Sequence, residues 1–134
     1  MIREKVKPFV NFQNEFENIG FNFHSIDGKY WNDGIAYRFT LAEIEKIEKA
    51  TEELFSIVYN TCEDIVTRGD TERFGFSSDV AQMIENSWNL CEYGTYSRFD
   101  LAYDGTNIKM LEINADTPTC LIESSLAQHY WLLH

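Results

Sequence analysis

The sequence has few of the residues that build disulfide frameworks, thiolate metal sites or membrane spans. Its three cysteines are odd in number and form no Cys-x-x-Cys pair, which argues against paired disulfides and against a zinc site. No apolar run approaches the length of a membrane span, and residues 1–5 lack an apolar signal segment. We therefore expect a cytoplasmic protein with reduced thiols and no membrane partner.

Positive charge is also scarce, with 11 Lys and Arg against 22 Asp and Glu and a net charge of −11. This balance argues against a nucleic-acid partner and is compatible with a cationic partner such as a polyamine. Glycine-rich phosphate loops and the Gly-x-Ser-x-Gly nucleophile motif are absent from the sequence. A nucleotide would therefore have to be held in another way.

Apolar residues make up 44% of the chain and aromatic residues 15%, enough for a core in one domain over residues 1–134. Apolar spacing predicts helices over about 9–19, 41–68, 78–91 and from 121 to at least 133. Thr40 and Glu43 form a capping box, and Thr119 is the expected cap of the last helix. The expected buried face of this last helix contains Leu121, Ser124 or Ser125, Gln128, and Trp131 or Leu132, broadened by Ile122, Leu126 and Leu133. Residues 21–39 are expected to be an irregular, aromatic-rich connector, in which the lone His24 has a structural role.

Two short runs of strand-forming residues flank Asp104-Gly105 and predict a β-hairpin over about 96–114. The predicted fold is therefore α+β, with helices packed on a small antiparallel sheet centred on this hairpin. Strand alternation places the apolar residues Phe99, Leu101, Tyr103, Leu111 and Ile113 on one face. The same alternation places four polar residues on the other face: Arg98, Asp100, Glu112 and Asn114.

This grouping requires Asp100 to lie opposite Met110 or Glu112 rather than Leu111, because directly opposed residues share a face. The turn must then contain an odd number of residues, or carry a bulge. A three-residue loop over residues 104–106, with Gly105 in the left-handed conformation, satisfies the requirement.

Two carboxylates and an amide oxygen are hard ligands that suit Mg²⁺, which completes its shell with water and phosphate. Arg98 beside them presents a planar fork of donors suited to phosphate or carboxylate. The alternative is a solvated polar face with one Arg–Asp pair, as on many antiparallel sheets.

The runs 96–105 and 109–119 resemble the glutathionylspermidine synthase family, whose members are ATP-grasp ligases that join the glycine carboxylate of glutathione to an amine of spermidine. The likeness extends over nearly the whole chain. It implies a partial ATP-grasp-type synthetase fold, corresponding to the N-terminal portion, without the C-terminal part that grips the nucleotide. We therefore expect the chain alone to be inactive or nearly so.

The resemblance also implies roles for individual residues. Asp100, Glu112 and Asn114 would hold Mg²⁺ at the ATP phosphates, and Arg98 would stabilise the transferring phosphoryl group. A substrate-binding loop would lie beside the glutathione site and contain Asp116, Thr117, Thr119 and Cys120. The implied reaction forms an amide between a glutathione-like carboxylate and a spermidine-like amine through an acyl phosphate.

Two alternatives remain open from the residues alone. The chain could be a non-catalytic module that binds a metal, a peptide or a polyamine on the hairpin face. The apolar C-terminal helix could instead serve homo-oligomerisation. Cys120, at the junction of a loop and a helix, is either an activated thiol or a small buried residue.

Overall fold

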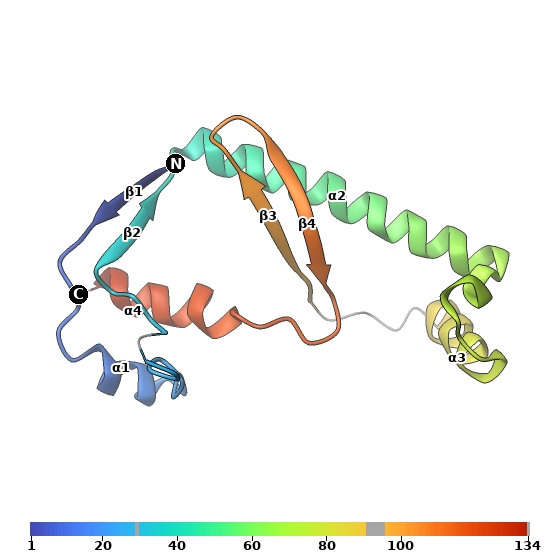
Figure 1. Ribbon diagram of the computed structural model, residues 1–134, viewed down its shortest axis with the longest axis horizontal. Helices are drawn as coiled ribbons and strands as arrows, with labels where there is room; N and C mark the ends of the chain where they lie inside the picture. Colours follow the sequence, from blue (N-terminus) through green and yellow to red (C-terminus); the bar gives the residue numbers. More distant parts are fainter. Residues whose placement is uncertain (29, 91–95, 134) are drawn as a thin grey trace. The chain divides into compact units, whose positions relative to one another are not determined.

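The computed structural model describes residues 1–28, 30–90 and 96–133 (Figure 1). Helices combine with two antiparallel sheets of two strands each, which confirms the predicted α+β class. The chain forms two compact units: unit 1 comprises Met1–Ile44 with Thr117–His134, and unit 2 comprises Glu45–Asp116. The predicted helix end near Cys91 lies outside the described residues. The expectation of a single domain stays a prediction.

Unit 1 contains a sheet that the sequence analysis missed. Strand β1 (Ile2–Lys5) pairs antiparallel with β2 (Ile35–Arg38), and the two lie side by side in Figure 1. We expected residues 21–39 to be irregular and predicted no strand there. That expectation is wrong for Ile35–Arg38, because these short strands lack a clear alternation of apolar and polar residues. An ion pair between Arg38 and Glu4 joins the strands at 3.4 Å.

Aromatic rings form the core of unit 1. Helix α1 (Phe12–Asn18) contributes Phe16, which is fully buried and meets the Trp31 ring edge-on at 4.9 Å. Phe21 is also fully buried. The predicted helix is confirmed but starts at Phe12, because Asn11 before it adopts a left-handed φ of 62°. The expected structural role of His24 agrees with its burial among these rings, where the centre of its ring lies 5.7 Å from that of Phe12.

The predicted C-terminal helix is confirmed, although its cap and its buried face differ from expectation. Ser124 N donates to the Cys120 carbonyl at 2.9 Å, so Cys120 rather than Thr119 is the cap residue. A π-helical segment, η2 (Glu123–Ala127), precedes α4 (Gln128–Leu133). The wider π-turn changes which side chains face the core, burying Glu123 and Ala127. Four leucines are exposed instead: Leu121, Leu126, Leu132 and Leu133. Their use in oligomerisation stays a prediction.

Helix α2 (Leu41–Arg68) has the predicted bounds and the predicted capping box. Thr40 N donates to Glu43 Oε2 at 2.9 Å, and Glu43 N donates back to Thr40 Oγ1 at 3.3 Å. No side chain of α2 is fully buried, although Ile47, Leu54 and Val58 of the predicted apolar stripe are partly covered. No helix among the described residues is both long and apolar enough to cross a membrane.

Two further helical segments of unit 2 follow α2. A short 3-10 helix, η1 (Asp70–Phe74), leads into α3 (Ser78–Asn89), which is capped by Ser77. The Trp88 ring lies 5.1 Å from the Tyr59 ring of α2, so this aromatic pair joins α3 to α2.

Candidate functional site

The predicted hairpin is present in unit 2, where β3 (Arg98–Tyr103) pairs antiparallel with β4 (Ile108–Asn114). The connection contains the four residues 104–107, so the predicted three-residue loop is wrong. Asp104 Oδ1 accepts from Thr106 N at 2.8 Å and from Asn107 N at 2.6 Å. These hydrogen bonds, led by the one from Asn107, lower the pKa of Asp104 to about 2. Gly105 has the predicted left-handed conformation, with a φ of 95°.

A bulge in β4 corrects the register of the hairpin. With a four-residue connection and no irregularity, Asp100 would lie opposite Leu111. Leu101 pairs with Met110 and Asp100 pairs with Glu112, so Leu111 is the extra residue between the two pairs. The bulge that we named as the alternative to an odd turn is therefore confirmed. Leu111 is 70% exposed, so the prediction that it shares the apolar face with Ile113 is wrong, and Met110 takes its place opposite Leu101.

The four predicted polar residues lie together at the base of this hairpin. Arg98 is paired with Asn114, and Asp100 is paired with Glu112 two positions along. The Arg98 guanidinium donates through Nε to Asp100 Oδ1 at 2.8 Å and through Nη2 to Asp100 Oδ2 at 3.3 Å. Asn114 Nδ2 donates to Glu112 Oε1 at 2.9 Å. The polar cluster, as we call these four residues, is thus joined by hydrogen bonds along each strand.

Arg98 favours the ionised form of Asp100. Its hydrogen bond to Asp100 is the main reason why the pKa of that carboxyl is lowered, and its positive charge acts in the same direction. Asp100 and Glu112 lie directly opposite each other on the two strands, so their side chains share one face of the hairpin. The side chains of Arg98 and Asp100 are 29% and 37% exposed, so a ligand can reach them.

The donor set of the polar cluster fits a hard divalent cation that has few protein ligands. Among residues 1–28, 30–90 and 96–133, no group of three or more His, Cys, Asp or Glu side chains is arranged to hold a metal. Two adjacent carboxylates with a neighbouring amide are enough for Mg²⁺, which commonly keeps waters and binds substrate phosphates. The guanidinium of Arg98 and a cation would compete for the Asp100 oxygens.

The four residues of the predicted substrate loop divide between the units. Asp116 is the last residue of unit 2, whereas Thr117, Thr119 and Cys120 belong to unit 1. Cys120 is partly buried, has a φ of 78°, and its Sγ lies 3.7 Å from Thr119 Oγ1. Each unit is described by itself, so the proximity of this loop to the polar cluster stays a prediction.

Beside Cys120, unit 1 holds a polar contact that the sequence analysis missed. The Tyr30 hydroxyl donates to Oε1 of the buried Glu123 at 2.8 Å. This hydrogen bond is the main reason why the pKa of Tyr30 is raised to about 12, and Cys120 contributes in the same direction. The available signal was an acidic residue within an apolar helical stretch, because such a residue needs a partner when it is buried.

Comparison with known proteins identifies a class of ligase-related domains. Residues 3–134 match the family described as glutathionylspermidine synthase preATP-grasp. A Haemophilus influenzae protein named "Putative acid--amine ligase" is 46% identical over 119 residues, which cover 86% of this chain and 30% of that protein. The chain belongs to the glutathionylspermidine synthase preATP-grasp family, and it matches less than a third of the length of this relative.

Proposed function

We propose that the chain supplies the phosphate- and Mg²⁺-binding hairpin of an ATP-dependent acid–amine ligase. The ligase would join a glutathione-like peptide carboxylate to a polyamine-like amine through an acyl phosphate. Family membership and the name of the relative support the ligase class. The observation that carries the assignment of residues is the Asp100–Glu112 pair, which lies beside the guanidinium fork of Arg98.

Each residue of the polar cluster has a distinct role in this proposal. Asp100 and Glu112 would bind the cation directly, and Asn114 would orient Glu112 and offer its amide oxygen. Bound Mg²⁺ would neutralise the charge on the ATP phosphates, which is most of what phosphoryl transfer requires of a protein. Arg98 would exchange its bond to Asp100 for one to the transferring phosphoryl group, because its planar fork fits either partner.

The remaining predicted residues would bind the peptide substrate. Asp116, Thr117, Thr119 and Cys120 offer a carboxylate, two hydroxyls and a thiol along one short segment. These groups could orient the peptide so that its terminal carboxylate meets the phosphoryl group. The amine would then attack the activated carbonyl carbon, and phosphate would leave.

A metal titration tests the carboxylate pair without needing ligase activity. We expect Mn²⁺, a paramagnetic substitute for Mg²⁺, to broaden the backbone amide NMR signals of residues 98–100 and 112–114 first. Asp100→Asn or Glu112→Gln should weaken this effect about 10- to 100-fold. Glu72→Gln in η1, an exposed carboxylate in the same unit, is the matched control and should change nothing. Equal broadening in all four proteins would refute the metal assignment.

An activity assay tests the ligase itself. In a protein of the full length of the Haemophilus influenzae relative, we expect phosphate release from ATP to depend on both glutathione and spermidine. The substitutions equivalent to Asp100→Asn and Glu112→Gln should reduce turnover on the order of 100-fold. Metal binding at the hairpin without any ATP-dependent amide formation would favour the non-catalytic module instead.

A further inference from the structure

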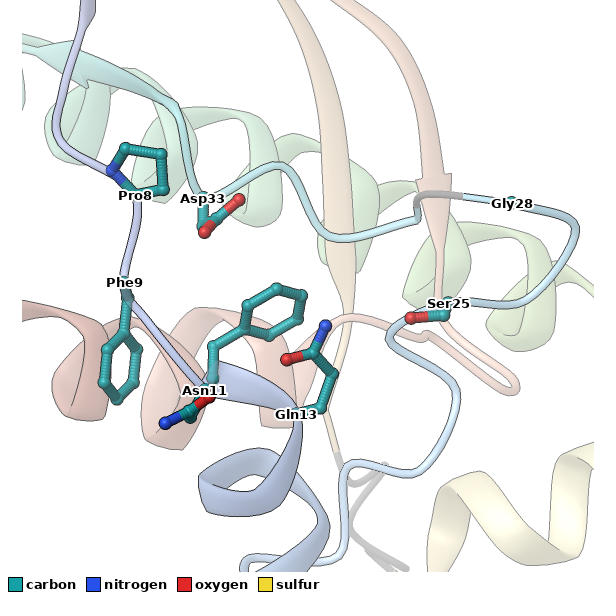
Figure 2. A pocket seen from close by; sticks show the side chains of 8 residues that line it. Pro8, Phe9, Asn11, Gln13, Ser25, Gly28 and Asp33 are labelled. Atoms are coloured by element: carbon teal, nitrogen blue, oxygen red, sulfur yellow. The ribbon is translucent and has the colours of Figure 1, made fainter.

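Unit 1 contains a polar pocket that the proposed ligase chemistry does not use. Its volume is about 370 Å³, which is within the range of small-molecule sites. Asn11, Gln13, Ser25 and Asp33 supply polar groups to its wall, and Phe9 and Phe12 supply aromatic rings. Figure 2 shows the Asp33 carboxylate, the Gln13 amide and the Ser25 hydroxyl facing the same opening from three different segments.

Asp33 gives the pocket its charge. The residue is only 4% exposed, which is unusual for an aspartate, and it still lines the pocket. It already has an interaction partner within the chain, so a ligand would share this carboxylate. A buried carboxylate attracts a cation more strongly than a surface one does, because less water screens the interaction.

The hydrogen bonds of His24 determine what Ser25 can offer to a ligand. His24 Nε2 lies 3.3 Å from Glu17 Oε1, and a carboxylate oxygen only accepts, so Nε2 carries the hydrogen. In the neutral ring Nδ1 is then an acceptor, and the Ser25 hydroxyl, 2.7 Å away, donates to it. The lone pairs of Ser25 Oγ remain to accept a hydrogen bond from the pocket.

The pocket wall therefore combines hydrogen-bond acceptors with aromatic surface. Asp33 and Ser25 accept, and the side-chain amide of Gln13 can turn an oxygen toward a donor. The Phe9 and Phe12 rings add faces that attract a cation and apolar surface for a short carbon chain. This combination suits a ligand that is cationic, rich in N–H donors and partly apolar.

We propose that this pocket of unit 1 binds a small organic ammonium ion, with its N–H groups on Asp33 and Ser25 and its carbon chain along Phe9 and Phe12. The inference does not rest on the proposed ligase function, because every residue that it uses belongs to unit 1 and none belongs to the polar cluster. Its failure would leave the metal titration of the hairpin unaffected.

Butylammonium chloride is the probe, and backbone amide NMR of the full chain is the readout. We expect saturable shifts at Gln13, Ser25 and Asp33. 1-Butanol, which has the same carbon chain without the charge, should bind at least tenfold more weakly. Tetramethylammonium carries the charge without N–H donors and should also bind more weakly. Absence of saturable shifts with butylammonium, or equal binding of butanol, would overturn the proposal.

Substitutions identify the groups responsible. Asp33→Asn should weaken butylammonium binding about tenfold or more, and Ser25→Ala, at an exposed position, about threefold or more. Asp27→Asn is the control, because Asp27 is an exposed carboxylate of the same loop that does not line the pocket. Its φ of 52° is one that asparagine adopts readily. If Asp33→Asn does not fold, the affinity of Ser25→Ala for butylammonium still tests the site. Equal losses of affinity in Ser25→Ala and Asp27→Asn would overturn the proposal, because the loss would then not depend on residues that line the pocket.

Discussion

Replacing Tyr30 by Phe removes one oxygen atom from unit 1 and leaves the buried Glu123 carboxylate without its 2.8 Å hydrogen bond. A hydrogen bond to a charged group contributes about 1.5–3 kcal/mol to stability when it is buried. The rise in the pKa of Tyr30, from 10.0 to about 12, corresponds to about 2.7 kcal/mol of interaction free energy that favours the protonated phenol. Tyr30 is 50% exposed, however, so water screens the interaction and we expect a loss of about 1 kcal/mol.

The pH dependence provides a second signature of the same contact. Below pH 10 the phenol keeps its proton in both the folded and the unfolded chain, so the stabilisation is fully present. Between pH 10 and about 12 the unfolded chain loses this proton while the folded chain retains it. The free energy of unfolding should therefore fall as the pH rises through this window, and Tyr30→Phe should remove this part of the decrease.

Urea denaturation followed by circular dichroism measures the free energy of unfolding, and absorbance at the phenolate wavelength measures the titration. Tyr37→Phe, at a 55% exposed position on β2, is the matched control and should leave stability unchanged. If Tyr30→Phe is as stable as the control at neutral pH and the high-pH absorbance steps of the two variants coincide, the contact between Tyr30 and Glu123 contributes nothing.

Two further predictions concern the core and the hairpin turn. Phe16→Ala should lower the free energy of unfolding by about 3–5 kcal/mol, because Phe16 is fully buried among rings. Val10→Ala, at a 71% exposed position, is its control. Similar chemical denaturation midpoints for the two variants would contradict the assigned core. The Asp104 carboxyl should titrate with a pKa of about 2, as followed by carbon NMR. The stabilisation from its hydrogen bonds should therefore be fully present above pH 3.8 and be lost as the pH falls through about 2. An ordinary midpoint near 3.8 would mean that these hydrogen bonds do not persist in solution.

Features encoded by neighbouring residues could be predicted from the sequence. The α2 cap needs only Thr40 and Glu43, three residues apart, so the signal and the structure are both local. The polar cluster could be predicted because strand alternation fixes which side chains share a face. The length of the turn could not, because two turns keep Asp100 and Glu112 on one face. A three-residue loop would pair Asp100 with Met110, and the four-residue loop with a bulge pairs it with Glu112.

Features that depend on distant segments escaped prediction. The pairing of Ile2 with Arg38 depends on backbone hydrogen bonds between segments with no distinctive side-chain pattern. The contact between Tyr30 and Glu123 spans 93 positions in the sequence. The buried face of the last helix was wrong because a π-turn breaks the 3.6-residue period on which the prediction relied.

The bulge at Leu111 divides the hairpin into a tip and a base. Three residue pairs separate the 104–107 connection from the Asp100–Glu112 pair, and the pairing at the base continues through Phe99–Ile113 and Arg98–Asn114. A peptide tag or fluorescent label inserted after Gly105 would therefore lengthen the tip without changing which side chains meet at the base. The hairpin tip thus offers an attachment point for a reporter of ligand binding.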